Sequence, residues 1–208
     1  MISPKPFLWE EDKALNFFQI YNKIGVHHPT GHAISREMIA LIFFEETGFS
    51  NVRQNKGSGP AVGFGQMEIY NPDKIPFFEW LGFNSDRRKS DSRLPLITPE
   101  RIVNDNDFSV RLTCKYFQWL VGEHHKSTVG ALQAQTGGGA NLSFIPVWLS
   151  AEKELQSVLY SGDRVRLMKA LNRARSGGPH PNPIPLQQFK AYWDFIVPEA
   201  DMVLGFRQ

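Results

Sequence analysis

Two adjacent carboxylates, Glu45 and Glu46, end an otherwise apolar run of the chain. If that run is helical, Glu46 lies on one face with Ile39, Ile42 and Phe43, the residues seven, four and three positions before it. Burial among these side chains and the negative end of the helix dipole both disfavour a charged carboxylate. We therefore predict that the pKa of Glu46 is raised, by burial first and by the dipole second, as a general acid requires.

A structural interpretation of the same pair is also open. One carboxylate would then be exposed, and the other would pair with an arginine such as Arg36 or Arg53. We favour this structural role for Glu45. For Glu46 we keep both the catalytic and the structural interpretation.

A glycine-rich segment follows this helix after a short loop. It reads Gly-Phe-Gly-Gln-Met-Glu-Ile over residues 63–69 and predicts a small β-hairpin near residues 58–70. Glycines at such a site let the backbone approach a ligand closely, and Gly63 and Gly65 are candidates for such a role.

The rest of the chain has apolar residues at helical spacing, with capping residues, first-turn prolines and glycines at the expected helix ends. We therefore predict a mainly α fold with one small β element, organised as a single domain over residues 1–208, with the helices of residues 145–208 packed on the core. Helices are expected at 10–24, 36–46, 72–82, from 99 onward, and at 107–121, 127–135, 145–159, 163–175 and 186–196.

Composition excludes several classes of function. The 208 residues are 41% hydrophobic and 21% charged, which is typical of a globular domain, and the net charge of +2 gives no reason to expect a nucleic-acid partner. The single cysteine, Cys114, excludes an internal disulfide bond, and we expect it to be buried. No apolar run is long enough to span a membrane, and the first residues lack a signal-peptide pattern. We expect synthesis in the cytoplasm.

The catalytic helix and the glycine-rich segment together resemble the lysozyme-like superfamily, in particular soluble lytic transglycosylases and goose-type lysozymes. Residues Glu46–Phe49 match the end of the family's catalytic helix, and Gly63–Ile69 match its glycine-rich block. Residues Ala134–Gly138 occupy the place of a third block, on a helix end that lines the sugar groove. The resemblance covers about residues 30–140.

This resemblance implies a lysozyme-like helical domain that cleaves the β-1,4 bond between N-acetylmuramic acid and N-acetylglucosamine in peptidoglycan. Glu46 would be the general acid and base, no cofactor or metal would be needed, and we expect a monomer. A protein without a signal peptide would reach the cell wall by another route of release. The residues implied in substrate binding are Gly63, Gly65, Gln66, Tyr70, Gln135 and Thr136.

The chain departs from the family pattern in ways that leave the mechanism open. Glu68 replaces a glutamine, and the acidic residues that position water in goose-type enzymes would fall near Gly59 and Tyr70, where this chain has none. Glu68 is the candidate second carboxylate. With it the enzyme would hydrolyse the bond; without it the family analogy favours lytic transglycosylation.

Two further alternatives remain. A non-catalytic lysozyme-like module of a phage or secretion apparatus would bind glycan or protein without cutting it. A glycosidase for another amino-sugar polymer, such as chitin or chitosan, would use the same acid.

Three other patterns favour structural roles. Pro29 and Gly31 separate His28 from His32 and disfavour a helical metal site. The charged segment 85–92 is interpreted as a solvated loop in preference to a basic ligand patch. Trp80 is expected in the core.

Overall fold

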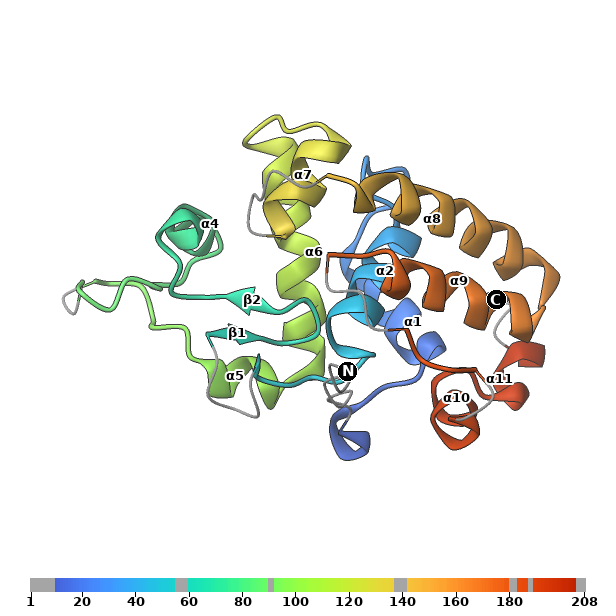
Figure 1. The fold of residues 1–208 in the computed structure, drawn as a ribbon. Helices are drawn as coiled ribbons and strands as arrows, with labels where there is room; N and C mark the ends of the chain where they lie inside the picture. Colours follow the sequence, from blue (N-terminus) through green and yellow to red (C-terminus); the bar gives the residue numbers. More distant parts are fainter. Residues whose placement is uncertain are drawn as a thin grey trace, which may run out of the picture.

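The computed structural model describes residues 10–54, 60–89, 92–136, 142–179, 183–186 and 189–204. It is mainly helical with one two-stranded antiparallel sheet, so the predicted fold class is confirmed. Figure 1 shows α2 near the centre, with α8 and α9 on one side and the β-hairpin, α4 and α5 on the other. The described elements are η1 (Glu11–Lys13), α1 (Phe17–His27), α2 (Arg36–Thr47), β1 (Ala61–Val62), β2 (Met67–Glu68), η2 (Pro72–Lys74), α4 (Ile75–Trp80), α5 (Pro99–Val103), α6 (Asn106–Gly122), α7 (Thr128–Gln135), α8 (Phe144–Ser161), α9 (Arg164–Ser176), α10 (Lys190–Ile196) and α11 (Glu199–Leu204).

Helix α2 is the helix around which the others are arranged. Its backbone begins where the Ser35 side chain accepts a hydrogen bond from the Met38 amide, and it ends at Gly48, whose φ of 58° is easy for glycine. Helices α1, α8 and α9 pack against it. The helix has apolar residues on every face over residues 38–44 because its middle is buried.

The β-hairpin forms where the glycine-rich segment predicts it. Ala61 pairs with Glu68 and Val62 with Met67. At the turn, Gln66 adopts a φ of 46°, which is uncommon for a residue with a side chain. The hairpin prediction is confirmed, although each strand has only two residues.

Two local predictions are wrong. The first helix starts at Phe17, not near residue 10, because Asn16 and Gln19 form a reciprocal capping box there. Trp80 ends the short helix α4 with 44% of its surface exposed, although its ring stacks on Phe77. Apolar periodicity indicates the buried face of a helix, but it does not show which residues at the end of a short helix lack other elements packed against them.

One cluster of buried hydrophobic side chains extends from Phe17 in α1 to Met202 in α11. Trp148 in α8 is fully buried, and its indole N–H donates to the Ala174 carbonyl at 3.2 Å. The C-terminal helices α8 and α9 therefore share the core that holds α2. Cys114 is buried, as expected. Within the described ranges, none of the helices combines the length and the apolar character that crossing a membrane requires.

His28, at the end of α1, gives the fold a pH-dependent element. Its side chain is 1% exposed and its Nε2 lies 2.8 Å from the Ile34 carbonyl, a geometry in which Nε2–H donates. Burial lowers the pKa of His28 to about 4, from 6.5. Between these two pH values the unfolded chain binds a proton that the folded chain does not, so stability falls as the pH is lowered.

We expect His28 to remove about 2 kcal/mol of stability between pH 7 and pH 5. Urea unfolding of the wild type and of His28→Gln, which retains a donor, measures this loss as the difference between their pH slopes. His125→Gln, at an exposed position, is the matched control and should follow the wild type. Parallel slopes for the wild type and His28→Gln would contradict the assignment.

Candidate functional site

Glu46 lies in the last turn of α2, partly exposed, beside the buried Glu45. The pKa of Glu46 is raised well above its ordinary value, by burial first and by the negative charge of Glu45 second. Lys74 and Arg175 act in the opposite direction. The direction agrees with the sequence prediction, and the neighbouring carboxylate is a cause that the prediction did not include. A carboxyl group in these surroundings holds its proton at a higher pH than an ordinary glutamate and is suited to act as an acid.

The end of α2 is closed by a buried arginine from the far end of the chain. The Arg175 guanidinium is 6% exposed and donates to the carbonyls of Phe44 at 2.9 Å and Glu45 at 3.0 Å. Tyr192 contacts the Gly48 carbonyl at 3.5 Å. The Glu45 carbonyl is one that a helix end leaves without an intrahelical partner, whereas the Phe44 carbonyl also accepts from the Gly48 amide at 2.9 Å. The arginine that the structure places on the Glu45 backbone is thus Arg175, whereas Arg36 donates to the His28 carbonyl at 3.1 Å.

Glu45 itself is enclosed and not exposed. It is 2% exposed, and a Cβ placed on Gly178 would lie 2.9 Å from its Oε1 and 2.7 Å from its Cγ. The connection after α9 therefore lies directly on the Glu45 side chain. The charge of Glu45 at this point helps to raise the pKa of Glu46.

Two hydrogen bonds join the hairpin to the helices around Glu46. The Thr47 hydroxyl lies 3.2 Å from the Phe64 carbonyl and 3.1 Å from the Phe43 carbonyl. The Gln135 amide, at the end of α7, donates to the Gly65 carbonyl at 2.6 Å. The end of α2, the turn of the hairpin and the end of α7 are thus in contact. These are the three segments that the family resemblance matches as separate blocks, and Glu46 lies in the first of them.

Gly63 and Gly65 have a different use from the one expected. A Cβ on Gly63 would lie 2.5 Å from the Ser109 hydroxyl, and one on Gly65 would lie 2.5 Å from the Thr113 hydroxyl. Both glycines are buried against α6. Their missing side chains let the hairpin approach a helix, so the expectation that they let a polysaccharide approach is not supported by their position.

We expect Gly65→Ala to lower the free energy of unfolding by about 1–3 kcal/mol, because the added methyl group overlaps Thr113 and approaches Phe43 to 3.2 Å. Urea denaturation measures the loss. Gly122→Ala is the matched control, since nothing lies within 4 Å of its added Cβ, and its stability should change by less than about 1 kcal/mol. A Gly65→Ala protein of unchanged stability that binds glycan weakly would instead favour the ligand role.

Lys74, a lysine that sequence reasoning missed, is affected by the charges of both Glu68 and Glu46. Glu68 accepts a hydrogen bond from the Asn71 amide at 3.0 Å. Lys74 is 6% exposed and its ammonium lies 4.9 Å from the centre of the Tyr116 ring. Burial lowers the pKa of Lys74, while the charges of Glu68 and Glu46 act to raise it. Lys74 therefore interacts with both candidate carboxylates. In the sequence it looks like an ordinary surface lysine in a capping turn.

The other predicted binding residues, Gln66, Thr136 and Tyr70, do not share one site. Gln66 donates to the carbonyls of Gly63 at 2.9 Å and Val52 at 3.1 Å, so its amide stabilises the hairpin turn. Thr136 donates to the Gln133 carbonyl at the end of α7. Tyr70 is a predicted binding residue that lines an open cleft.

No group of three or more metal-ligating side chains occurs among the described residues. Comparison with known protein families, with characterised proteins and with solved structures found no match to this chain. The functional argument therefore depends on the chemistry of these residues.

Proposed function

We propose that this protein is a glycosidase that cleaves the β-1,4 bond between N-acetylmuramic acid and N-acetylglucosamine in bacterial cell-wall glycan. The observation that carries the proposal is the raised pKa of Glu46, caused by burial and by the charge of Glu45, at a partly exposed position. A carboxyl group that stays protonated and remains reachable can protonate a glycosidic oxygen.

In this reaction Glu46 donates its proton to the leaving oxygen while the bond to the anomeric carbon breaks. The resulting Glu46 carboxylate then accepts a proton from the attacking hydroxyl group. If that group is the muramyl 6-hydroxyl, the new bond joins O6 to C1 and the product has an anhydro end. If a water held by Glu68 attacks from the opposite face instead, Glu68 accepts the water proton and the product has a reducing end. The charge of Lys74 supports the first step, proton donation, because it stabilises the Glu46 carboxylate that this step forms.

Glu68 is the residue that would distinguish the two outcomes. An inverting hydrolase needs a second carboxylate about 6.5–9.5 Å from the acid to hold the attacking water. Glu68 keeps an exposed surface, and its Oε2 accepts from Asn71, which would orient the other oxygen. In the transglycosylation pathway Glu68 has no chemical step, and its replacement by glutamine would leave the rate close to that of the wild type.

A second candidate function is a non-catalytic glycan-binding module. One observation favours it: the open cleft is lined by Tyr70 and not by Glu46. In such a module the raised pKa of Glu46 would be only a consequence of packing.

The test is digestion of purified peptidoglycan, with mass spectrometry of the released fragments. Anhydro-muramyl ends would identify a lytic transglycosylase, and reducing muramic acid ends would identify a muramidase. Chitin and chitosan oligomers, digested in parallel, test the alternative polymers. If the glycan stays intact in every digestion while the protein still binds peptidoglycan, the result would favour the non-catalytic binding module over the enzyme.

A further inference from the structure

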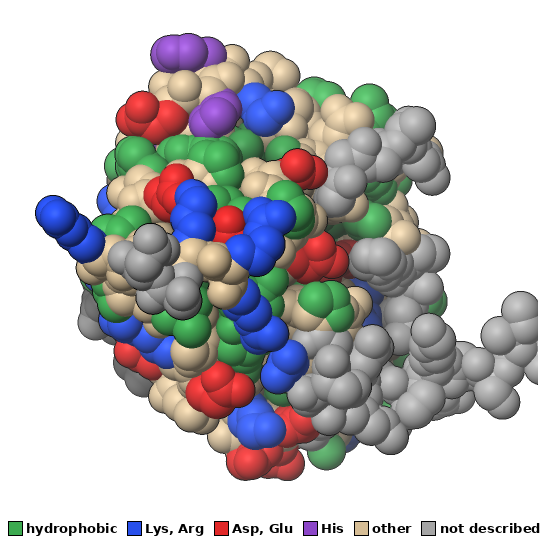
Figure 2. All heavy atoms as spheres, turned by 90° about the vertical axis from the view of Figure 1, so that its left-hand side faces the viewer, with side chains coloured by type: hydrophobic (Ala, Val, Ile, Leu, Met, Phe, Trp, Pro, Cys, Tyr) green, Lys and Arg blue, Asp and Glu red, His purple; other side chains and the backbone are tan. Residues whose placement is uncertain are grey.

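An open cleft of about 730 Å³ lies between the hairpin end and the segment that connects α4 with α5. Its size is in the range of small-ligand sites. Its lining includes Arg53, Tyr70, Arg87, Lys89, Leu96 and Glu100. The described lining residues thus include three cationic side chains and one carboxylate. The face in Figure 2 shows the same tendency, with Lys and Arg side chains running through its middle and acidic side chains beside them.

Arg87 is the cation in this cleft that is best placed to meet a ligand. Its guanidinium lies 3.6 Å from the centre of the Tyr70 ring, and the side chain is exposed. Among the described residues no carboxylate forms an ion pair with Arg87, whereas its neighbour Arg88 binds Asp86 through Nε at 2.9 Å and Nη2 at 3.2 Å. A guanidinium stacked on a ring keeps its N–H edge available for a bidentate bond to an oxyanion.

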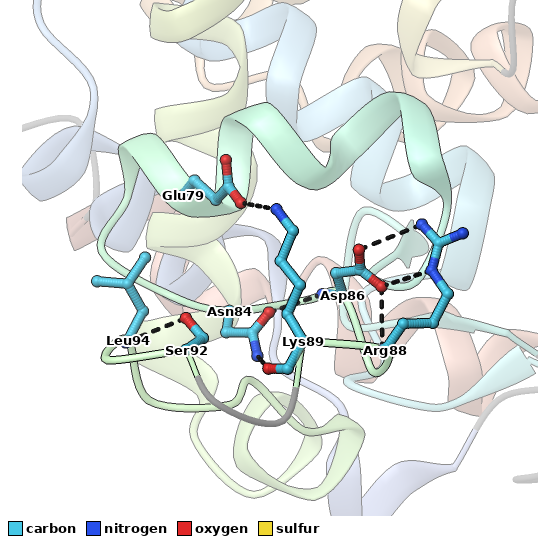
Figure 3. A network of polar contacts seen from close by, with 7 residues as sticks. All are labelled: Glu79, Asn84, Asp86, Arg88, Lys89, Ser92 and Leu94. Atoms are coloured by element: carbon cyan, nitrogen blue, oxygen red, sulfur yellow. Dashed lines mark hydrogen bonds and ion pairs between the residues drawn. The ribbon is translucent and has the colours of Figure 1, made fainter.

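The segment that carries Arg87 is held in shape before any ligand arrives (Figure 3). The Asn84 side chain donates to the Lys89 carbonyl at 2.9 Å and accepts from the Asp86 amide at 2.9 Å. Lys89 reaches back to Glu79 of α4 at 2.9 Å. Because these bonds fix the loop, little ordering is required when a ligand binds. The sequence interpretation as a simple solvated loop therefore misses its contribution to the cleft wall.

The cleft is connected in sequence to the proposed catalytic groups. Tyr70 follows Glu68 by two residues, and Lys74, which interacts with Glu68 and Glu46, follows Tyr70 by four. A ligand in the cleft would therefore contact the segment that carries Glu68 and Lys74.

On the basis of the proposed function, we propose that this cleft binds carboxylates of the short acidic peptides attached to cell-wall glycan, with Arg87 on Tyr70 as the main contact. Cell-wall glycan carries such peptides and chitin does not. The cleft thereby selects peptide-bearing glycan over a neutral amino-sugar polymer.

The test is calorimetric binding of the peptide N-acetyl-alanyl-γ-glutamyl-diaminopimelic acid to the full-length protein. This peptide contains no glycosidic bond, so the result does not depend on whether the protein cleaves glycan. We expect measurable binding by the wild type, about tenfold weaker binding by Arg87→Gln, and unchanged binding by the matched control Arg88→Gln. The same peptide with its carboxylates amidated should bind at least tenfold more weakly than the acid.

Three results would overturn the proposal. If Arg87→Gln and Arg88→Gln lose peptide affinity equally, binding would depend on overall positive charge and not on Arg87 in the cleft. If the amidated peptide binds as tightly as the acid, the carboxylates are not what the cleft recognises. Tight binding of inorganic phosphate with none of the peptide would assign the cleft to phosphate ligands. Circular dichroism of both variants checks that they are folded.

Discussion

Replacing Glu46 with glutamine is expected to lower the rate of glycan cleavage by about 10²- to 10⁴-fold while leaving glycan binding unchanged. Glutamine has nearly the same shape but no proton of suitable acidity to give to the leaving oxygen. Release of soluble fragments from peptidoglycan measures the rate, and co-sedimentation with the same peptidoglycan measures binding. Equal cleavage by the wild type and Glu46→Gln would remove Glu46 from the chemistry.

Glu45→Gln is the matched control, one residue away. It retains the acid but removes the negative charge that helps to raise the pKa of Glu46. A general acid loses activity as the pH rises through its pKa, so the alkaline fall in rate should move to lower pH in this variant. In the wild type, the fall should lie above the ordinary glutamate pKa of 4.5. A wild-type profile without such a group would contradict the assignment of Glu46 as the acid.

Arg175→Met should lower the free energy of unfolding by about 3–5 kcal/mol. The change leaves the buried carbonyls of Phe44 and Glu45 without the donor that Arg175 provides, and it removes a positive charge from the surroundings of two carboxylates. Methionine preserves most of the apolar volume, so the loss reports the charge and the hydrogen bonds. Urea unfolding measures it.

Arg173→Met is the matched control on the same helix. Its side chain is about half exposed and binds Ser150 and Glu154 at 3.2 Å each, a surface arrangement worth less than about 1 kcal/mol. Similar losses in the two variants would mean that Arg175 does not specifically secure the end of α2. In the folded Arg175→Met protein, the pKa of Glu46 should rise further, because the arginine opposes the raised value.

Most helices could be predicted because their signals are local. Ser35, Thr98 and Asp163 each cap a helix start through their own side chains, and Gly48 ends α2 through its own backbone. The predicted start of the first helix was wrong because the apolar stripe extends past the capping box that decides where the helix begins. The exposed Trp80 shows the same limit, since burial depends on neighbours that periodicity does not identify.

The candidate site was only partly predictable. Glu46 was a candidate because a carboxylate at the end of an apolar helix is unusual, and the resemblance to lysozyme-like proteins favoured it over Glu45. Lys74 and Arg175 could not be found, since each looks like a surface cation until the fold buries it. Gly63 and Gly65 were recognised as close-contact positions, but the partner of that contact is α6 and not an open groove.

The amino-acid sequence alone determines the helical class, the hairpin position and the absence of an internal disulfide bond. These follow from periodicity, capping, composition and spacing, which act over a few residues. The proposal that Glu46 is the acid also depends on the resemblance to lysozyme-like proteins. The tertiary structure alone decides which charges surround that acid and which cations share a cleft with Tyr70. These depend on contacts between residues far apart in the chain, such as Arg175 with Phe44 and Gln135 with Gly65, because electrostatic surroundings are set by distance in space.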